Sequence, residues 1–204
     1  RYNPYTVFFD WVKMYAISIQ NACVSIHGDI WKHREKIYKE TMRKYSKEEI
    51  KEFCRMSGLL VSCFEKNGIK DYLGDIYMKS GAGSKITGQF FTPFHISVLN
   101  ATTLLSNVSK EEKIRLNEPS AGGGGLILAA AKVLEDKGIN YQKCLDVTAQ
   151  DLDWNGVYMT YIQLSLLGID AEVIQGNTLS QEVIEKKVSK ENILFTPARM
   201  GVFI

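Results

Sequence analysis

Apolar residues in the first 80 positions recur every three or four residues, the spacing that places them on one face of a helix. Ser46 is followed three residues later by Glu49, a pair that caps the start of a helix, and Asn67-Gly68 is a typical helix end. Four helices are predicted, over about residues 8–22, 29–45, 47–67 and 71–78. We therefore expect residues 1–79 to form a small helical region with no chemistry of its own.

The pattern changes after Ser80-Gly81-Ala82-Gly83-Ser84, which is predicted to be a flexible link. Beyond it, short apolar segments alternate with helical ones, which favours an α/β fold built on a parallel sheet. Strands are predicted at residues 113–116, 144–150, 171–174 and 192–195, and helices at residues 94–105, 126–136 and 154–167. Pro93 is expected at the first position of its helix, where its missing amide is harmless. A second domain, with a mostly parallel sheet, is therefore predicted over residues 86–204.

A glycine-rich turn joins the first predicted strand to the next helix. Residues 117–125 read Asn-Glu-Pro-Ser-Ala-Gly-Gly-Gly-Gly, and glycines let a backbone turn sharply and approach a ligand closely. A turn of this kind, after the first strand of an α/β sheet, is where nucleotide-like cofactors bind. No frame of the segment fits the dinucleotide fingerprint G-x-G-x-x-G/A, and the phosphate-binding loop motif is also missing. The carboxylate of Glu118 favours a ligand with a positive charge, such as an amino group or a sulfonium.

Two segments resemble motifs of the amino-methylating DNA methyltransferases. Glu118-Pro119-x-x-Gly122-x-Gly124 resembles the D/N/E-P-x-x-G-x-G loop that binds S-adenosyl-L-methionine (SAM). Upstream, Gly88-Gln89-Phe90-Phe91-Thr92-Pro93 is similar to the G-Q-F-[FY]-T-P signature of the modification subunits of type I restriction systems and related adenine (N6) methyltransferases. The resemblance covers about Asp71 to Pro197. It implies a Rossmann-like SAM-methyltransferase fold, SAM as cofactor, and methylation of DNA in a restriction–modification system.

The resemblance also implies which residues hold the methionine tail of SAM. Phe91 would form an apolar wall near the sulfonium, Thr92 would offer a hydroxyl, and Glu118 would pair with the amino group of the tail. The full set of residues expected around the tail is Phe91, Thr92, Pro93, Glu118, Pro119, Ser120, Gly122 and Gly124. Phe90 is expected in the core. In the alternative interpretation, Phe90-Phe91 only staples the start of a helix.

The adenosine part of SAM is assigned to residues after the second and third strands. Asp151 is expected on the ribose hydroxyls, with Leu152 against the adenine face. Asp151 could instead cap the following helix, but Asp153 is better placed as that cap. Asn177 stands where the family has an acid that accepts a hydrogen bond from the adenine amine, and an Asn carbonyl accepts more weakly. The alternative for Asn177 is a turn residue.

The motif that carries the chemistry of the family is degenerate in this chain. In the family, N/D-P-P-[YFW] follows the fourth strand; its Asn and a proline carbonyl accept the hydrogens of the target amine, and its aromatic ring stacks on the extruded base. Aligned on the second proline, this sequence reads Phe195-Thr196-Pro197-Ala198. Phe195 cannot accept these hydrogens and Ala198 offers no stacking surface, so no catalytic residue is assigned. Two hypotheses follow: a divergent DNA adenine methyltransferase, or a non-catalytic SAM-binding module with a regulatory or interaction role.

The composition adds only modest constraints. The net charge is +2, and 45% of residues are hydrophobic and 24% charged, an ordinary profile for a soluble protein. No apolar run approaches the roughly 18 residues of a membrane span, and no secretory signal is present, so a cytoplasmic location and no membrane partner are expected. The four cysteines and three histidines lack the spacing of metal ligands, so no metal is expected.

Positive charge is concentrated in the first part of the chain. Residues 1–80 carry 14 Lys and Arg against 10 Asp and Glu, and residues 32–44 are the most basic segment. This segment is read either as a solvated helix face or as a surface that contacts phosphates. DNA is the expected partner, through other regions or subunits, together with a possible specificity subunit. The start at Arg1 suggests a fragment or a processed chain, and the end at Ile204, shortly after the degenerate motif, leads us to expect a C-terminal truncation.

Overall fold

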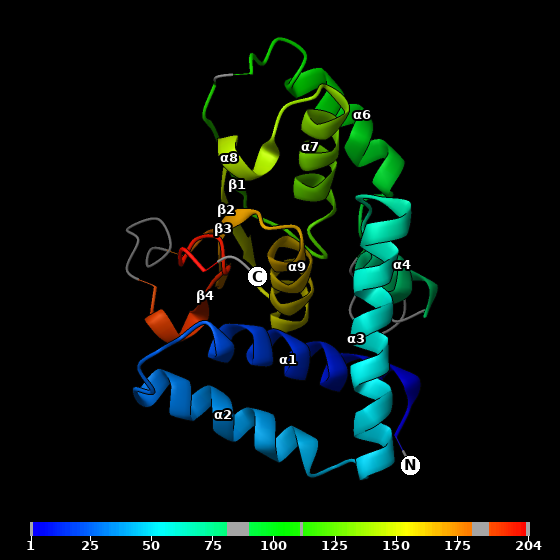
Figure 1. The fold of residues 1–204 in the computed structure, drawn as a ribbon, viewed down its shortest axis with the longest axis vertical. Helices are drawn as coiled ribbons and strands as arrows, with labels where there is room; N and C mark the ends of the chain where they lie inside the picture. Colours follow the sequence, from blue (N-terminus) through cyan, green and yellow to red (C-terminus); the bar gives the residue numbers. More distant parts are fainter. Residues whose placement is uncertain (1, 81–89, 111, 181–187, 203–204) are drawn as a thin grey trace.

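One four-stranded sheet organises the second part of the chain (Figure 1). The computed structural model describes residues 2–80, 90–110, 112–180 and 188–202. The strands are β1 (Ile114–Glu118), β2 (Leu145–Asp151), β3 (Asp170–Gln175) and β4 (Ile193–Phe195), and they lie in the order β1-β2-β3-β4. The first three run parallel, which confirms the predicted mostly parallel sheet. Among the described strands, β1 and β4 are therefore the two edges of the sheet.

The fourth strand runs antiparallel to β3, so the sheet is mostly and not wholly parallel. Ile193 pairs with Ile174 and Phe195 pairs with Glu172, which means that the chain re-enters the sheet at the end where β3 leaves it. A parallel return requires a crossover that carries the chain back along the sheet. The short 3-10 helix η1 (Lys190–Asn192) directly precedes β4.

Two helices follow the first two strands and pack against the sheet. α7 (Gly125–Asp136) contacts β1, and α9 (Trp154–Leu166) contacts β2 and β3. α9 is buried without a gap from Gly156 to Ser165, because it lies between the sheet and the N-terminal helix α1 (Figure 1). A helix that is apolar on all sides is typical of this position. α6 (Phe94–Leu104) packs on α7.

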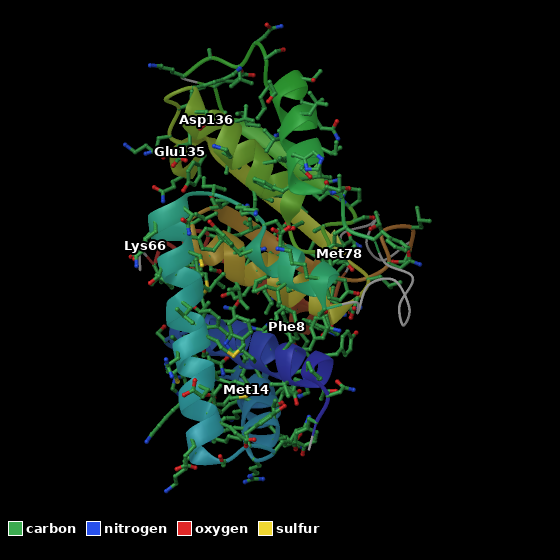
Figure 2. All side chains as sticks on the ribbon, turned by 90° about the vertical axis from the view of Figure 1, so that its right-hand side faces the viewer. Phe8, Met14, Lys66, Met78, Glu135 and Asp136 are labelled. Carbon is green, nitrogen blue, oxygen red and sulfur yellow. The ribbon has the colours of Figure 1, made fainter. Side chains whose placement is uncertain are left out.

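The four predicted N-terminal helices are confirmed. They are α1 (Pro4–Ala22), α2 (Asp29–Met42), α3 (Lys47–Asn67) and α4 (Tyr72–Lys79). The capping box before α3 is present, since Ser46 accepts from the Glu49 amide and Glu49 accepts from the Ser46 amide. Figure 2 shows Phe8 and Met14, both buried, on α1 near α3. α8 (Tyr141–Cys144), a single turn before β2, was not predicted.

The N-terminal helices also hold the edge of the sheet. α1 packs along α9, and the Gln20 side chain accepts a hydrogen bond of 3.0 Å from the Phe195 amide in β4. Arg34 of α2 donates to the Ile193 carbonyl at 2.8 Å. The predicted division into residues 1–79 and 86–204 stays a prediction, and the link at residues 81–84 lies outside the described residues.

Ion pairs account for most of the basic segment at residues 32–44. Three of its lysines pair with acids of α2 itself, as Lys32–Asp29, Lys36–Glu40 and Lys39–Glu35. Lys44 pairs with the buried Asp10 of α1 at 3.0 Å. This arrangement favours the interpretation of the segment as a solvated helix face. No helix among the described residues is long and apolar enough to cross a membrane.

Candidate functional site

The glycine turn between β1 and α7 has the backbone conformation that its sequence predicts. Gly122 and Gly124 have φ angles of 54° and 91°, in the left-handed region that favours glycine. The Ala121 amide donates to the Gln150 carbonyl at 2.8 Å, which ties the turn to β2. Gly124 is the N-cap residue of α7. The turn is therefore fixed at the carboxyl ends of β1 and β2.

Asp151, the last residue of β2, connects this turn to α9. Its carboxylate accepts hydrogen bonds from the Gly122 amide at 2.7 Å and from the Asp153 amide at 2.9 Å. Asp153 caps α9 by accepting from the Asn155 amide at 3.1 Å, which confirms the assignment of the cap to Asp153. Gly156 lets α9 approach, since a Cβ atom there would lie 2.9 Å from the Asp151 carboxyl carbon. Asp151 thus contacts the predicted cofactor loop directly.

The described part of the upstream motif lies against the same turn. The Phe91 ring stacks on Tyr77 of α4 with centroids 4.7 Å apart, and a Cβ atom at Gly122 would lie 2.9 Å from that ring. Phe90 is 70% exposed, so its expected place in the core is wrong; Phe91 takes the packing position on Tyr77 instead. Pro93 is the N-cap residue of α6 and not, as predicted, its first residue. Gly88 and Gln89 lie outside the described residues.

A small cavity lies where these segments meet. Its volume is about 80 Å³. The lining residues come from several segments of the chain and include Asp71, Phe91, Thr92, Ser97 and Ser120 together with Gly122, Gly123 and Gly125. The structure therefore brings together the two motifs that the sequence singled out. Among the described residues, no cluster of His, Cys, Asp or Glu is arranged to hold a metal.

The turn after β3 reaches the glycine turn from the other side. Thr178 donates from its hydroxyl to the Pro119 carbonyl at 2.6 Å. Asn177 accepts from the Leu179 amide at 3.0 Å, which is the contact of a turn residue and corresponds to the alternative considered for it. Leu152 is 67% exposed beside this turn, where the Gln175 side chain donates to its carbonyl at 2.8 Å.

The segment Phe195-Thr196-Pro197-Ala198 lies at the opposite edge of the sheet from the cavity. Because β4 is antiparallel to β3, its carboxyl end lies at the amino end of β3. The buried Thr196 hydroxyl accepts from the Ala171 amide at 3.0 Å and donates to the Ile169 carbonyl at 2.8 Å. Arg199 forms ion pairs with Asp146 and Asp170, near the starts of these strands. The degenerate motif is therefore part of the packing of the sheet in this structure.

Thr196→Val is expected to lower the free energy of unfolding by about 1–3 kcal/mol, because it leaves the buried Ala171 amide without an acceptor. Urea denaturation measures the effect. Thr196→Ser, which keeps the hydroxyl, is the matched control and should lose less. Equal stability of the valine variant and the wild type would contradict a structural role for this hydroxyl.

Two buried polar residues at the cavity escaped the sequence analysis. Asp71 is only 4% exposed and accepts from the Gly74 amide at 2.9 Å and from Gln163 of α9 at 2.8 Å. Gln163 also donates to the Gly123 carbonyl at 2.7 Å. Burial raises the pKa of the Asp71 carboxyl, although the hydrogen bonds from Gln163 and Gly74 act in the opposite direction.

Asp71 brings one residue of the segment 1–79 to the cavity, and the expectation that this segment carries no chemistry stays a prediction. An Asp directly before a predicted helix is explained by its role as a helix cap. Asp71 is the N-cap residue of α4, so the sequence gave no reason to expect it at the cavity as well. The signal that was available is Gln163, a long polar side chain in an otherwise apolar helix. A buried Gln requires polar partners, and here they are Asp71 and the glycine turn.

A comparison with models of protein families finds one match, and the matched segment contains all the residues that line the cavity. A family model described as N-6 DNA Methylase matches residues 69–198 of the chain. The matched segment begins just before α4, and it contains Asp71, the glycine turn and all four described strands. Searches of curated proteins and of solved structures found no match.

Proposed function

Since the chain belongs to the N-6 DNA methylase family, we propose that it binds SAM in the cavity between the glycine turn and the segment Phe91-Thr92-Pro93, as a DNA adenine methyltransferase-like protein of a restriction–modification system. The observation that carries the proposal is the meeting of the two motifs. They are distant in the sequence, yet Phe91 packs against Gly122 and both line one cavity. The fold of residues 86–204 is accordingly proposed to be the Rossmann-like fold of SAM methyltransferases.

The proposed placement of SAM follows the carboxyl ends of the strands. The methionine tail enters the cavity, with Thr92 and Ser120 offering polar atoms and Phe91 an apolar wall. The ribose lies at Asp151, whose two oxygens each accept one amide hydrogen bond and keep a lone pair for a ribose hydroxyl. The exposed Leu152 side chain covers the adenine.

The adenine amine is proposed to donate to Asn177. Its Oδ1 atom already accepts from the Leu179 amide, and a carbonyl oxygen has room for a second donor. This bond is weaker than one to a carboxylate, so Asn177 contributes less than the acid that it replaces. DNA, and a specificity subunit that selects the site, are the proposed partners of the whole assembly.

A non-catalytic SAM-binding module is the second candidate function. It is favoured by the segment Phe195-Thr196-Pro197-Ala198, which lacks the groups that hold and stack the target base and lies at the far edge of the sheet. In this interpretation the chain senses the cofactor, or positions it for a partner subunit.

Calorimetric titration with SAM and with its demethylated product, S-adenosylhomocysteine, tests the proposal. We expect saturable heat and a rise in melting temperature with both ligands, because a ligand that binds only the folded state stabilises it. No heat and no shift in melting temperature at millimolar ligand would contradict it.

Asp151→Ala should weaken the binding of S-adenosylhomocysteine about 10- to 100-fold, because it removes charge-assisted hydrogen bonds to the ribose and to the Gly122 amide. Asp153→Ala is the matched control: it should remove about 1 kcal/mol of helix capping and leave the affinity nearly unchanged. Titration calorimetry and thermal unfolding of both variants separate the two effects. Equal losses of affinity would reject the ribose assignment.

A further inference from the structure

The Asp71 carboxylate explains glycines that the cofactor motif does not require. A Cβ atom at Gly125 would lie 2.9 Å from Asp71 Oδ2, one at Gly123 would lie 3.0 Å from Oδ1, and one at Gly74 would overlap Oδ2. None of these three glycines has a positive φ angle, so space and not backbone conformation excludes a side chain. Three positions around one buried carboxylate therefore carry no side chain.

This carboxylate occupies the amino end of α7. Gly125 is the first residue of α7, where unpaired amides and the helix dipole attract negative charge. In phosphate-binding turns this position receives the ligand's anion. Here the protein supplies its own anion, so the end of the helix is already neutralised and a phosphate would meet a like charge.

The cavity offers no positive group to balance Asp71. Among the described lining residues there is no Lys, Arg or His. The neighbouring Lys70 pairs with Asp75 at 3.0 Å on the surface of the same region. A buried carboxylate without a cationic partner is costly, and such a group in a cavity is a candidate for pairing with a ligand of opposite charge.

A buried hydroxyl without a partner among the described residues faces the same space. Ser97 of α6 lines the cavity and is fully buried, and its hydroxyl has no hydrogen-bond partner among the described residues. Buried hydroxyls are normally paired, so this one is available to a ligand. Glu118, which the sequence assigns to the amino group of the tail, accepts from the Ser120 amide at 3.0 Å and is not among the lining residues.

We infer that Asp71 and Ser97 bind a primary ammonium group, the α-amino group of the cofactor's amino acid end, and that Asp71 thereby makes the pocket select adenosines with an amino acid tail over those without one. The inference rests on the proposed binding of SAM and names the residues that read its tail. The carboxylate balances the charge of the ammonium, and the hydroxyl accepts a second of its three hydrogens.

The test compares S-adenosylhomocysteine with 5′-methylthioadenosine, which has the same adenosine and thioether but no amino acid tail. Asp71→Asn keeps the acceptor for Gly74 and Gln163 and removes the charge. We expect it to weaken the tailed ligand about 10- to 100-fold and the tailless ligand less than about twofold. Ser97→Ala should weaken the tailed ligand about three- to tenfold. Asp75→Asn, which neutralises a surface acid of the same helix, is the matched control and should change neither affinity.

The outcomes separate the inference from the proposal on which it rests. If the wild type binds neither ligand, the proposed function fails and the inference fails with it. If the wild type binds both ligands and Asp71→Asn weakens them equally, Asp71 has only a structural role and the inference alone is overturned. If Asp71→Asn does not fold, as judged by thermal unfolding, Ser97→Ala decides: an unchanged ratio of the two affinities overturns the inference.

Discussion

Gly122→Val is expected to reduce the affinity for S-adenosylhomocysteine by about 100-fold or more. A β-branched residue at a φ of 54° is strained by about 1–3 kcal/mol, and its Cβ atom would overlap the Phe91 ring. Relief of either conflict moves the Gly122 amide away from Asp151 or moves Phe91 out of the cavity wall. About 2.7 kcal/mol of lost binding free energy corresponds to 100-fold, and titration calorimetry measures it.

Gly138→Val is the matched control for this variant. Gly138 ends α7 with a φ of 70°, so the substitution introduces a similar backbone strain, but its Cβ atom would meet nothing within 4 Å. It should lower the melting temperature and leave the affinity unchanged. Equal losses of affinity in the two variants would mean that strain acts through global stability and not through the cofactor turn.

The second prediction is that the chain does not methylate DNA. The chain should transfer no measurable methyl group from tritiated SAM to mixed-sequence DNA, because Phe195 cannot accept the hydrogens of an amine and Ala198 cannot stack on a base. Stacking alone is worth about 1–3 kcal/mol per base. The position of this segment, across the sheet from the cavity, gives a second reason.

A restored motif tests that second reason. The double variant Phe195→Asn with Ala198→Tyr recovers the Asn and the aromatic ring of the family motif, but it leaves them at the far edge of the sheet and should remain inactive. Its melting temperature shows whether it is folded. Turnover by the wild type that disappears in Gly122→Val would refute the predicted inactivity, and it would show that other residues position the amine. Turnover gained by the double variant would refute the placement of the segment.

Local chemistry made much of the fold predictable. The glycine turn could be placed because few residues other than glycine adopt the conformation of Gly122 and Gly124. The start of α3 was readable because Ser46 and Glu49 cap it through contacts only three positions apart. Asp153 was recognisable as a cap for the same reason.

Features set by distant contacts could not be predicted. The direction of β4 is one example, since Ile193-Leu194-Phe195 is equally apolar in either direction and only the connection decides how it enters the sheet. Phe90 and Phe91 are a second example. The two residues are identical and adjacent, so the sequence could not show that Phe91, and not Phe90, packs on Tyr77.

The candidate site shows the same division. Its two motifs were visible as sequence, and their meeting at one cavity could be expected from the fold. Asp71 could not be found in this way, because its partner Gln163 lies 92 positions away and its local role as a helix cap is sufficient to explain it. A role that depends on burial appears only when the packing of α4 on α9 is known.

The edge position of β1 has a thermodynamic consequence for the cofactor. β1 pairs with β2 on one side, and no described strand pairs with its other side, so the glycine turn extends from an edge strand, the kind of strand to which a further strand can add. A segment that adds there orders β1 and, through it, the turn. Thermodynamic linkage makes this effect reciprocal. If an added strand raises the affinity of the protein for the cofactor by some factor, the bound cofactor raises the affinity of the protein for that strand by the same factor.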